Sequence, residues 1–141
     1  MRNYKEKDFS ALYEIEKNSF SDFWSEKGMK EDLAFSKSHY FVAEENGEII
    51  GFGGFILPFD EAEILKIAVK KEWRNKGVGK MLLTAMLSDA KMLGADKMFL
   101  EVRKSNESAR ALYEKNGFFS YSVREKYYDG IEDAVLYKKI L

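Results

Sequence analysis

Residues 62–103 restrict the fold more than any other stretch, because the spacing of their apolar side chains changes twice. The segment "AEILKIAV" (62–69) predicts a strand, and a wide apolar stripe over residues 77–93 predicts a helix that Gly94 stops. The next segment, "DKMFLEVR" (96–103), predicts another strand. A strand, a helix and a strand in this order predict a right-handed crossover between two parallel strands.

Two hairpins flank this crossover. In "HYFVAEENGEIIGFGGFIL" (39–57) the apolar residues alternate on both sides of the Asn-Gly dipeptide at 46–47, which favours a tight hairpin turn. Residues 118–141 predict a second hairpin, with its turn at the Asp-Gly dipeptide 129–130.

Three further helices complete the expected elements. After a short N-terminal strand, residues 7–18 and 25–37 predict two helices. The segment "NESARALYEKNGF" (106–118) predicts a third, short helix that is capped by Ser105 or Asn106 and closed by Gly117. The order β-α-α-β-β-β-α-β-α-β-β predicts an α/β (mixed α+β) fold with a single mixed central sheet flanked by helices. A length of 141 residues is typical of one domain, so a single domain over 1–141 is expected.

Composition excludes several classes of protein. The 23 basic against 24 acidic residues give a formal net charge of −1, which argues against a nucleic-acid binder. There is no cysteine, which excludes disulfides, thiolate metal sites and a cysteine acyl-enzyme, and the single histidine, His39, is given no role. The charged N-terminus and the lack of a long apolar run predict a cytoplasmic protein without a signal peptide or a membrane partner. No motif calls for a metal, so none is expected. A monomer or weak dimer is expected.

Two glycines stand at the head of the helix expected over 77–93. The nucleotide-hydrolase loop G-x-x-x-x-G-K-[ST] would need glycine at 74 and a hydroxyl residue at 81, where this chain has Arg74 and Met81. A helix start still suits an anion, because its first N–H groups are unpaired and carry partial positive charge. A solvated charged loop fits the pattern equally well. Within residues 66–80, six basic residues face one acidic residue: Lys66, Lys70, Lys71, Arg74, Lys76 and Lys80 against Glu72.

The segment "RNKGVGKMLL" resembles the acyl-CoA pyrophosphate loop of the GNAT superfamily of N-acetyltransferases, whose pattern is [QR]-x-x-G-x-[GA]. Arg74, Gly77 and Gly79 occupy its fixed positions. The segments "ILKIAV", "LEVRKSNESARALYEKNGF", "FSDFWSEKGM" and "YYDGIEDAVLYKK" are similar to other parts of the family in the same order. This resemblance covers most of the chain and implies the GNAT acyl-CoA N-acyltransferase fold, with acetyl-CoA (coenzyme A) as the cofactor.

The resemblance also implies where the cofactor binds. The backbone of Ile67, Ala68 and Val69 would pair with pantetheine, and one of these N–H groups would face the acetyl carbonyl oxygen. Asn106 and Tyr113 would contact coenzyme A as well. The pyrophosphate loop would comprise Arg74, Asn75, Lys76, Gly77, Val78, Gly79 and Lys80.

Transfer of an acetyl group to an amine requires a base, a stabiliser of the carbonyl oxygen and a proton for the departing thiolate. Glu101 is the candidate base, at the C-terminal end of an expected parallel strand. By pattern alone a surface carboxylate paired with Arg103 fits better, but Glu101 resembles the proposed base of the ribosomal-protein-alanine (RimI-like) branch. Tyr113 is the candidate acid, although a core aromatic is the alternative. Because there is no cysteine, direct attack in a ternary complex is expected.

The first pair of helices recognises the acceptor in this superfamily, together with the last hairpin. Trp24 and Ser25 in "FWSEK" resemble the "PWS" segment of the RimI-like branch, with Phe23 where that branch usually has proline. Both residues are therefore expected to contact the acceptor.

Tyr127, Tyr128 and Glu132 resemble a segment shared by protein N-terminal acetyltransferases. Two tyrosines can form a narrow slot for a chain end, or they can simply stabilise a hairpin. Glu132 could attract a cationic amine or face solvent. An α-amino group is also the easier nucleophile, since its pKa of about 7.7–8.0 leaves more neutral amine at pH 7 than the value of about 10.4 for lysine.

These observations predict a RimI-like protein N-terminal acetyltransferase. Its expected partner is a protein or peptide N-terminus, with the N-terminal alanine of a small-subunit ribosomal protein as the target. The alternatives are a small-amine (polyamine or aminoglycoside) or lysine acetyltransferase, or a non-catalytic acyl-CoA-binding interaction module. Such a module would have no need of both Glu101 and Tyr113.

Overall fold

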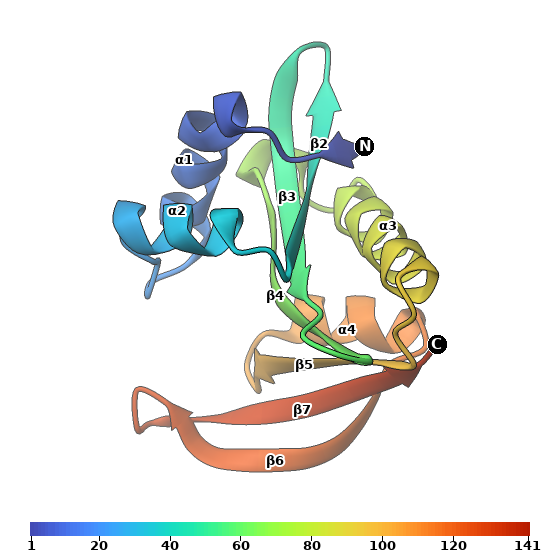
Figure 1. The fold of residues 1–141 in the computed structure, drawn as a ribbon. Helices are drawn as coiled ribbons and strands as arrows, with labels where there is room; N and C mark the ends of the chain where they lie inside the picture. The colour runs from blue at the N-terminus through green and yellow to red at the C-terminus, as the bar shows by residue number, and fades with distance from the viewer.

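A seven-stranded sheet in the order β1-β2-β3-β4-β5-β7-β6 runs through the structure, a computed structural model that describes all 141 residues (Figure 1). The strands are β1 (Arg2–Asn3), β2 (Ser38–Glu45), β3 (Glu48–Ile56), β4 (Glu61–Val69), β5 (Lys97–Arg103), β6 (Phe119–Tyr128) and β7 (Glu132–Ile140). The helices are α1 (Phe9–Ser19), α2 (Glu26–Ala34), α3 (Val78–Met92) and α4 (Glu107–Lys115), with 3-10 turns at Glu6–Asp8 and Lys71–Trp73. The predicted element order and the single mixed sheet are confirmed.

Both predicted hairpins form with the expected turns. Asn46 and Gly47 have φ angles of 51° and 82°, and Asp129 and Gly130 have φ angles of 56° and 66°. Positive φ at two successive positions is what tight hairpin turns require. The dipeptides at 46–47 and 129–130 therefore fix the register of β2 with β3 and of β6 with β7.

The crossover through α3 joins β4 and β5, which are parallel as predicted but share only a short ladder. Residues 61–63 of β4 pair with 97–99 of β5, and no pair follows. β5 continues its pairing with β7 as far as Arg103. Beyond residue 63 the two strands therefore separate, and Figure 1 shows β4 and β5 running in clearly different directions.

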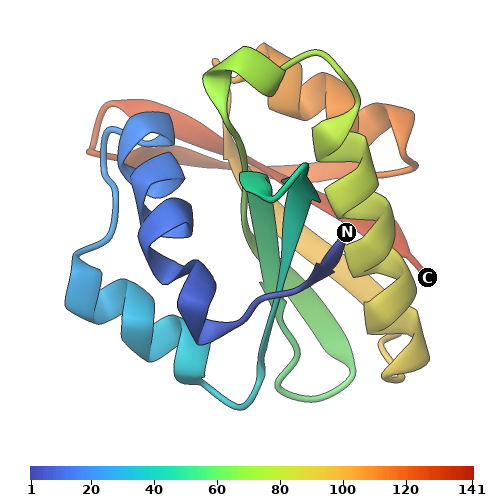
Figure 2. The same ribbon diagram turned by 90° about the horizontal axis from the view of Figure 1, so that it is seen from above.

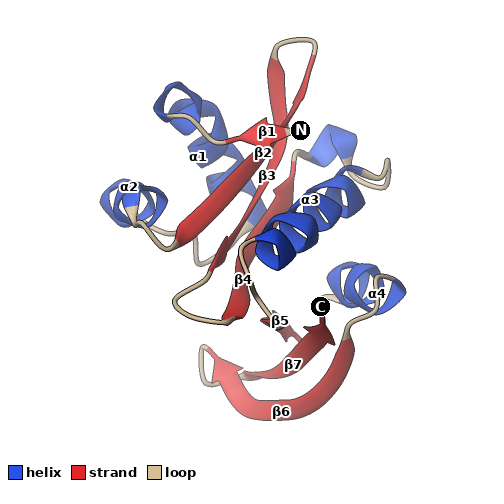
Figure 3. Cartoon of the chain, turned by 45° about the vertical axis from the view of Figure 1, so that its right-hand side comes forward, coloured by secondary structure: helices blue, strands red, loops and turns tan.

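Helices cover both faces of the sheet. Figures 2 and 3 show α1 and α2 on one side and α3 and α4 on the other. The core under α1 and α2 includes Leu12, Met29 and Phe52, and the larger core under α3 and α4 includes Met86 and Tyr113. Every helix is too short or too polar to span a bilayer.

The predicted bounds of two helices differ from the structure. α2 ends at Ala34, because Phe35 is extended, with φ −68° and ψ 130°, and the carbonyl of Lys37 accepts a hydrogen bond from the N–H of Leu57. The prediction that this helix reaches residue 37 is wrong. α1 begins at Phe9 and not at the predicted residue 7, because the 3-10 turn Glu6–Asp8 precedes it.

The alternative caps of α4 are resolved in favour of Asn106. Its Oδ1 accepts a hydrogen bond from the N–H of Ala109 at 3.2 Å. This bond satisfies one of the free N–H groups at the start of the helix.

Candidate active site

β4 has a free edge beyond residue 63, where β5 no longer pairs with it. The N–H of Lys70 donates to the carbonyl of Ile50 on β3 at 2.8 Å, so alternation along the strand points the N–H of Ala68 to β3 as well. Ile67 and Val69 therefore point their N–H groups toward the gap between β4 and β5. Unpaired N–H groups on an extended strand fit an amide chain such as pantetheine and a carbonyl oxygen that gains charge. Two of the three predicted strand residues thus have the required orientation.

The loop between β4 and α3 has the backbone geometry of an anion site. Asn75 and Gly77 have φ angles of 62° and 85°, and Gly77 is the N-cap of α3 without a side chain that bonds the first N–H groups. Val78 is buried and holds the helix start in the core. A Cβ on Gly79 would lie 3.4 Å from Cδ2 of Leu112, so the backbone is open to a ligand but no bulky side chain would fit. This arrangement fits a pyrophosphate.

Two of the six basic residues counted near this loop are engaged elsewhere. Lys66 is only 9% exposed and pairs with Glu16 inside the protein, so it does not add to the basic charge at the loop. Lys70 pairs with a glutamate of β3 at 3.5 Å. Arg74 donates from Nε to the last carbonyl of β4 at 3.0 Å, which ties the loop to the free edge. The other basic side chains are exposed on the loop or in the first turn of α3: Lys71, Lys76 and Lys80.

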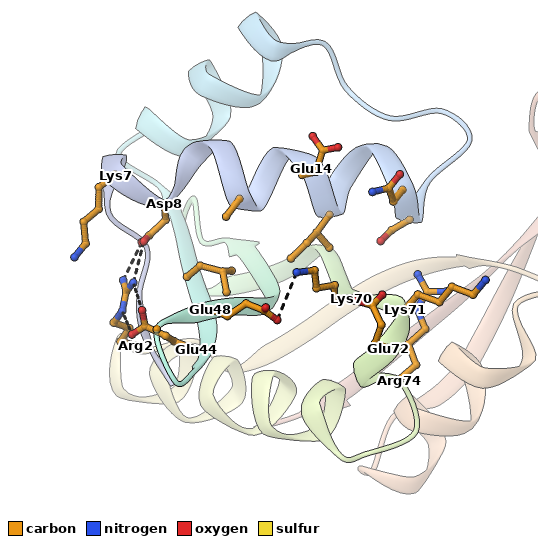
Figure 4. A pocket seen from close by; sticks show the side chains of 16 residues that line it. Arg2, Lys7, Asp8, Glu14, Glu44, Glu48, Lys70, Lys71, Glu72 and Arg74 are labelled. Atoms are coloured by element: carbon orange, nitrogen blue, oxygen red, sulfur yellow. Dashed lines mark hydrogen bonds and ion pairs between the residues drawn. The ribbon is translucent and has the colours of Figure 1, made fainter.

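A cavity of about 890 Å³ lies between α1, the β2–β3 turn and the start of the β4–α3 loop, where Lys70, Lys71 and Arg74 line it (Figure 4). Charged side chains of both signs line it, and Arg2 pairs there with Asp8 and Glu44. None of the predicted catalytic residues lines this cavity. Ion pairs within the protein compensate part of its charge.

Glu101 lies instead in a smaller cleft of about 440 Å³ between the β3–β4 turn, β5 and β6. Glu101 comes two residues after Phe99, which is the last residue of β5 that pairs with β4. It therefore lies where the two strands separate. Its side chain is 24% exposed, and its Oε1 lies 3.2 Å from Nη1 of Arg124. The alternative that Glu101 pairs with Arg103 is wrong, because Arg103 pairs with three other carboxylates.

Tyr113 is a core residue whose ring packs edge-on against Phe118, with the ring centroids 5.7 Å apart, and near Tyr137. Burial raises its pKa, and neighbouring Tyr128 adds to the shift. Burial, and then the charge of Glu101, raise the pKa of Tyr128 to about 12. Tyr113 is both a core aromatic and a phenol that stays protonated at neutral pH.

Arg103 joins the two segments expected to recognise the acceptor. Its Nη2 lies 3.7 Å from Asp22 in the α1–α2 loop and 3.4 Å from Asp129 at the tip of the β6–β7 hairpin. Its guanidinium also lies 4.4 Å from the centroid of the Tyr128 ring. Figure 2 shows this loop beside the hairpin tip. The sequence pattern suggested Arg103 only as a partner of Glu101, because nothing local indicates which distant carboxylates it meets.

The tyrosines of the hairpin form a pair beside Glu101. The rings of Tyr127 and Tyr128 meet edge to face with centroids 5.1 Å apart, and the guanidinium of Arg124 lies 4.7 Å from the centroid of Tyr127. Glu132 accepts a hydrogen bond from the N–H of Ser105 at 2.9 Å and pairs with an arginine of β5. The carboxylate of Glu132 is thus already engaged within the protein.

The predicted acceptor residues of the α1–α2 loop are held by hydrogen bonds. Ser25 caps α2, since its Oγ accepts from the N–H of Gly28 at 3.0 Å. The N–H of Trp24 donates to Oε2 of Glu16 at 3.0 Å, and its carbonyl accepts from the hydroxyl of Tyr13 at 2.8 Å. This part of the loop is therefore fixed in the free protein.

A free strand edge that leads into a helix start suited to an anion, with a carboxylate where the strands separate, is the arrangement expected of an acyl-CoA-dependent N-acyltransferase. The sequence profile described as "Acetyltransferase (GNAT) family" matches residues 9–118, and the chain belongs to this family. It is an acetyl-CoA-dependent N-acetyltransferase, which confirms the predicted family, enzyme class and cofactor.

Three relatives illustrate the similarity. The chain is 34% identical over 132 residues to "[Ribosomal protein bS18]-alanine N-acetyltransferase" of Escherichia coli (strain K12), covering 92% of this chain and 88% of that protein. The crystal structure of the ribosomal-protein-S18-alanine N-acetyltransferase from Escherichia coli superposes with a TM-score of 0.91 and 32% identity, over 98% of this chain and 90% of that one. A GNAT family acetyltransferase from Elizabethkingia anophelis with acetyl-CoA bound has a TM-score of 0.76 and 25% identity, over 92% and 90% of the two chains.

Proposed function

We propose that this enzyme acetylates the α-amino group of a protein N-terminus, and that its acceptor is the N-terminal alanine of a small-subunit ribosomal protein of the bS18 type. The observation that carries this proposal is the free edge of β4, where the N–H groups of Ile67 and Val69 face the gap that opens just before Glu101 on β5. The names of the relatives that cover most of the chain support the same acceptor.

The chain's own residues supply the three requirements of the reaction. Glu101 accepts the proton of the attacking amine, directly or through water, and passes it to solvent at the open side of the cleft. The N–H of Ile67 or of Val69 faces the carbonyl oxygen as it gains negative charge. Tyr113 donates a proton to the departing thiolate. Acetyl-CoA, when bound, supplies the activated acetyl group to this site.

An acidic cleft favours a second candidate, a polyamine acetyltransferase. The charged residues that line the cleft beside Glu101 are four carboxylates and one arginine: Asp60, Glu61, Glu63, Glu101 and Arg124. A small polycation would be attracted to this excess of negative charge. The tyrosine pair beside the cleft favours a peptide, since its rings can flank a backbone.

One experiment separates these functions. The enzyme is incubated with acetyl-CoA and an Ala-first peptide that has a free N-terminus and an internal lysine, and fragmentation mass spectrometry locates the acetyl group. The matched controls are the same peptide with a blocked N-terminus and spermidine. Acetyl on the terminal amine alone supports the proposal, and acetyl on lysine or faster turnover of spermidine overturns it. If nothing is acetylated while acetyl-CoA still binds, the interaction module gains support.

A further inference from the structure

A buried ion pair outside the residues assigned so far joins α1 to β4. Glu16 is 0% exposed, and its Oε2 lies 2.5 Å from Nζ of Lys66. Its other oxygen, Oε1, is buried without a hydrogen-bond partner, so the charge of Glu16 is balanced through Oε2 alone. A buried pair of this kind is weak evidence of net stabilisation, because both charges lose their hydration. The pair therefore calls for another explanation.

Both members of the pair also hold Trp24. Its N–H donates to the same Oε2 of Glu16 at 3.0 Å, and Nζ of Lys66 lies 3.6 Å from the centroid of its ring. The ring of Phe20 lies on the same ammonium group at 5.2 Å. A cation close to an indole face is attracted to it, and more strongly where water is excluded. The backbone and the ring of Trp24 are thus fixed by two charges that depend on each other.

The position of Lys66 on β4 connects α1 with the gap between β4 and β5. Its side chain points to α1, while the next residue, Ile67, turns its N–H toward the gap where the acetyl group would lie. A single strand position therefore ties the α1–α2 loop to the part of β4 that faces the reaction.

We propose that the Glu16–Lys66 pair is a positioning device that fixes the α1–α2 loop through Trp24 and thereby sets the affinity of the enzyme for its acceptor. Glu16 and Lys66 are positioning residues that touch neither acceptor nor acetyl-CoA. The inference rests on the proposed function in that this loop contacts the acceptor.

The test compares Lys66→Met with Asp8→Asn. Asp8 is 5% exposed and pairs at 2.8 Å with Arg2, which is 26% exposed, so its variant breaks a partly buried ion pair beside α1 that does not contact Trp24. With the acceptor identified by the peptide experiment, Lys66→Met raises the KM for the acceptor on the order of tenfold, while kcat and acetyl-CoA affinity change little. Asp8→Asn leaves the KM for the acceptor unchanged.

A KM for the acceptor that stays at the wild-type value in Lys66→Met, or that rises equally in Asp8→Asn, overturns the proposal. If Lys66→Met does not fold, the double variant Glu16→Gln with Lys66→Met is used, since it leaves no unpaired buried charge. It still lacks the cation beside Trp24 and has the same expected rise in KM.

A measurement without acceptor keeps this inference separable from the proposed function. The chain has two tryptophans, so a Trp73→Phe background leaves Trp24 as the single reporter. Lys66→Met in this background shifts the emission of Trp24 to longer wavelength and increases its quenching by acrylamide, whereas Asp8→Asn does not. Unchanged emission and quenching show that the pair does not position Trp24, whatever the acceptor is.

Discussion

Gly77 and Gly79 lie two residues apart in the proposed pyrophosphate loop, yet the structure predicts that alanine at the two positions has opposite effects on stability. Gly77 has a φ of 85°, and an added Cβ would meet no atom within 4 Å. The cost of Gly77→Ala is therefore that of the left-handed backbone alone, about 1.5 kcal/mol. Gly79 lies in the first turn of α3, and a Cβ would lie 3.4 Å from the flexible end of Leu112. Gly79→Ala therefore stabilises the helix by about 0.5 kcal/mol.

Thermal unfolding without acetyl-CoA, followed by circular dichroism, measures this difference. For a chain of this size each kcal/mol shifts the Tm by about 3–4 °C, so the variants should melt about 6–8 °C apart, on either side of the wild type. Calorimetric titration should also show weaker acetyl-CoA binding to Gly77→Ala than to Gly79→Ala. If Gly77→Ala melts with the wild type, the loop does not depend on the left-handed residue and the reasoning fails.

Glu101→Gln should lower kcat by about 10² or more with an unchanged Kd for acetyl-CoA, and unchanged turnover in a steady-state assay would remove its role as base. Tyr113→Phe should slow turnover at saturating peptide more than it raises the KM for the peptide. The opposite pattern would make Tyr113 an acceptor-site residue. Hydrogen bonds from Ser105, and then Arg103, lower the pKa of Glu132. Its contribution to stability is complete above its unfolded pKa of about 4.3 and disappears as the pH falls. Urea unfolding should therefore show a gap between wild type and Glu132→Gln that narrows on acidification, and a gap that widens would contradict this.

The local pattern of the sequence predicts most of the fold because its signals act within a few residues. The turn dipeptides at 46–47 and 129–130 need positive φ, and they have it. The alternation on β5 correctly places Glu101 on the partly exposed face. The predicted end of α2 is wrong because the cause of the observed end is distant in sequence. The carbonyl of Lys37 accepts a hydrogen bond from the N–H of Leu57, and no helix-breaking residue stands at Phe35.

Charge partners are the part of the site that the sequence could not supply. The sequence pattern includes Lys66 among the basic residues near the β4–α3 loop, but the side chain of Lys66 points to buried Glu16. The local pattern pairs Glu101 with its neighbour Arg103, but in the structure Glu101 forms an ion pair with Arg124 of β6. Long side chains reach partners that only the sheet order brings near, so local spacing carries no information about them.

Burial explains how the proposed acid and base divide their roles. A base that must release its proton after each turnover needs contact with water, and Glu101 is 24% exposed at the cleft. A donor must stay protonated until the thiolate departs, and burial of Tyr113 raises the pKa of its phenol above the ordinary value of about 10. Exchanging the two environments would leave a buried carboxylate that resists ionisation and an exposed phenol without a raised pKa. The division of roles, with the amine proton leaving through Glu101 to solvent and a separate proton supplied by Tyr113, therefore follows from which strand or helix carries each residue.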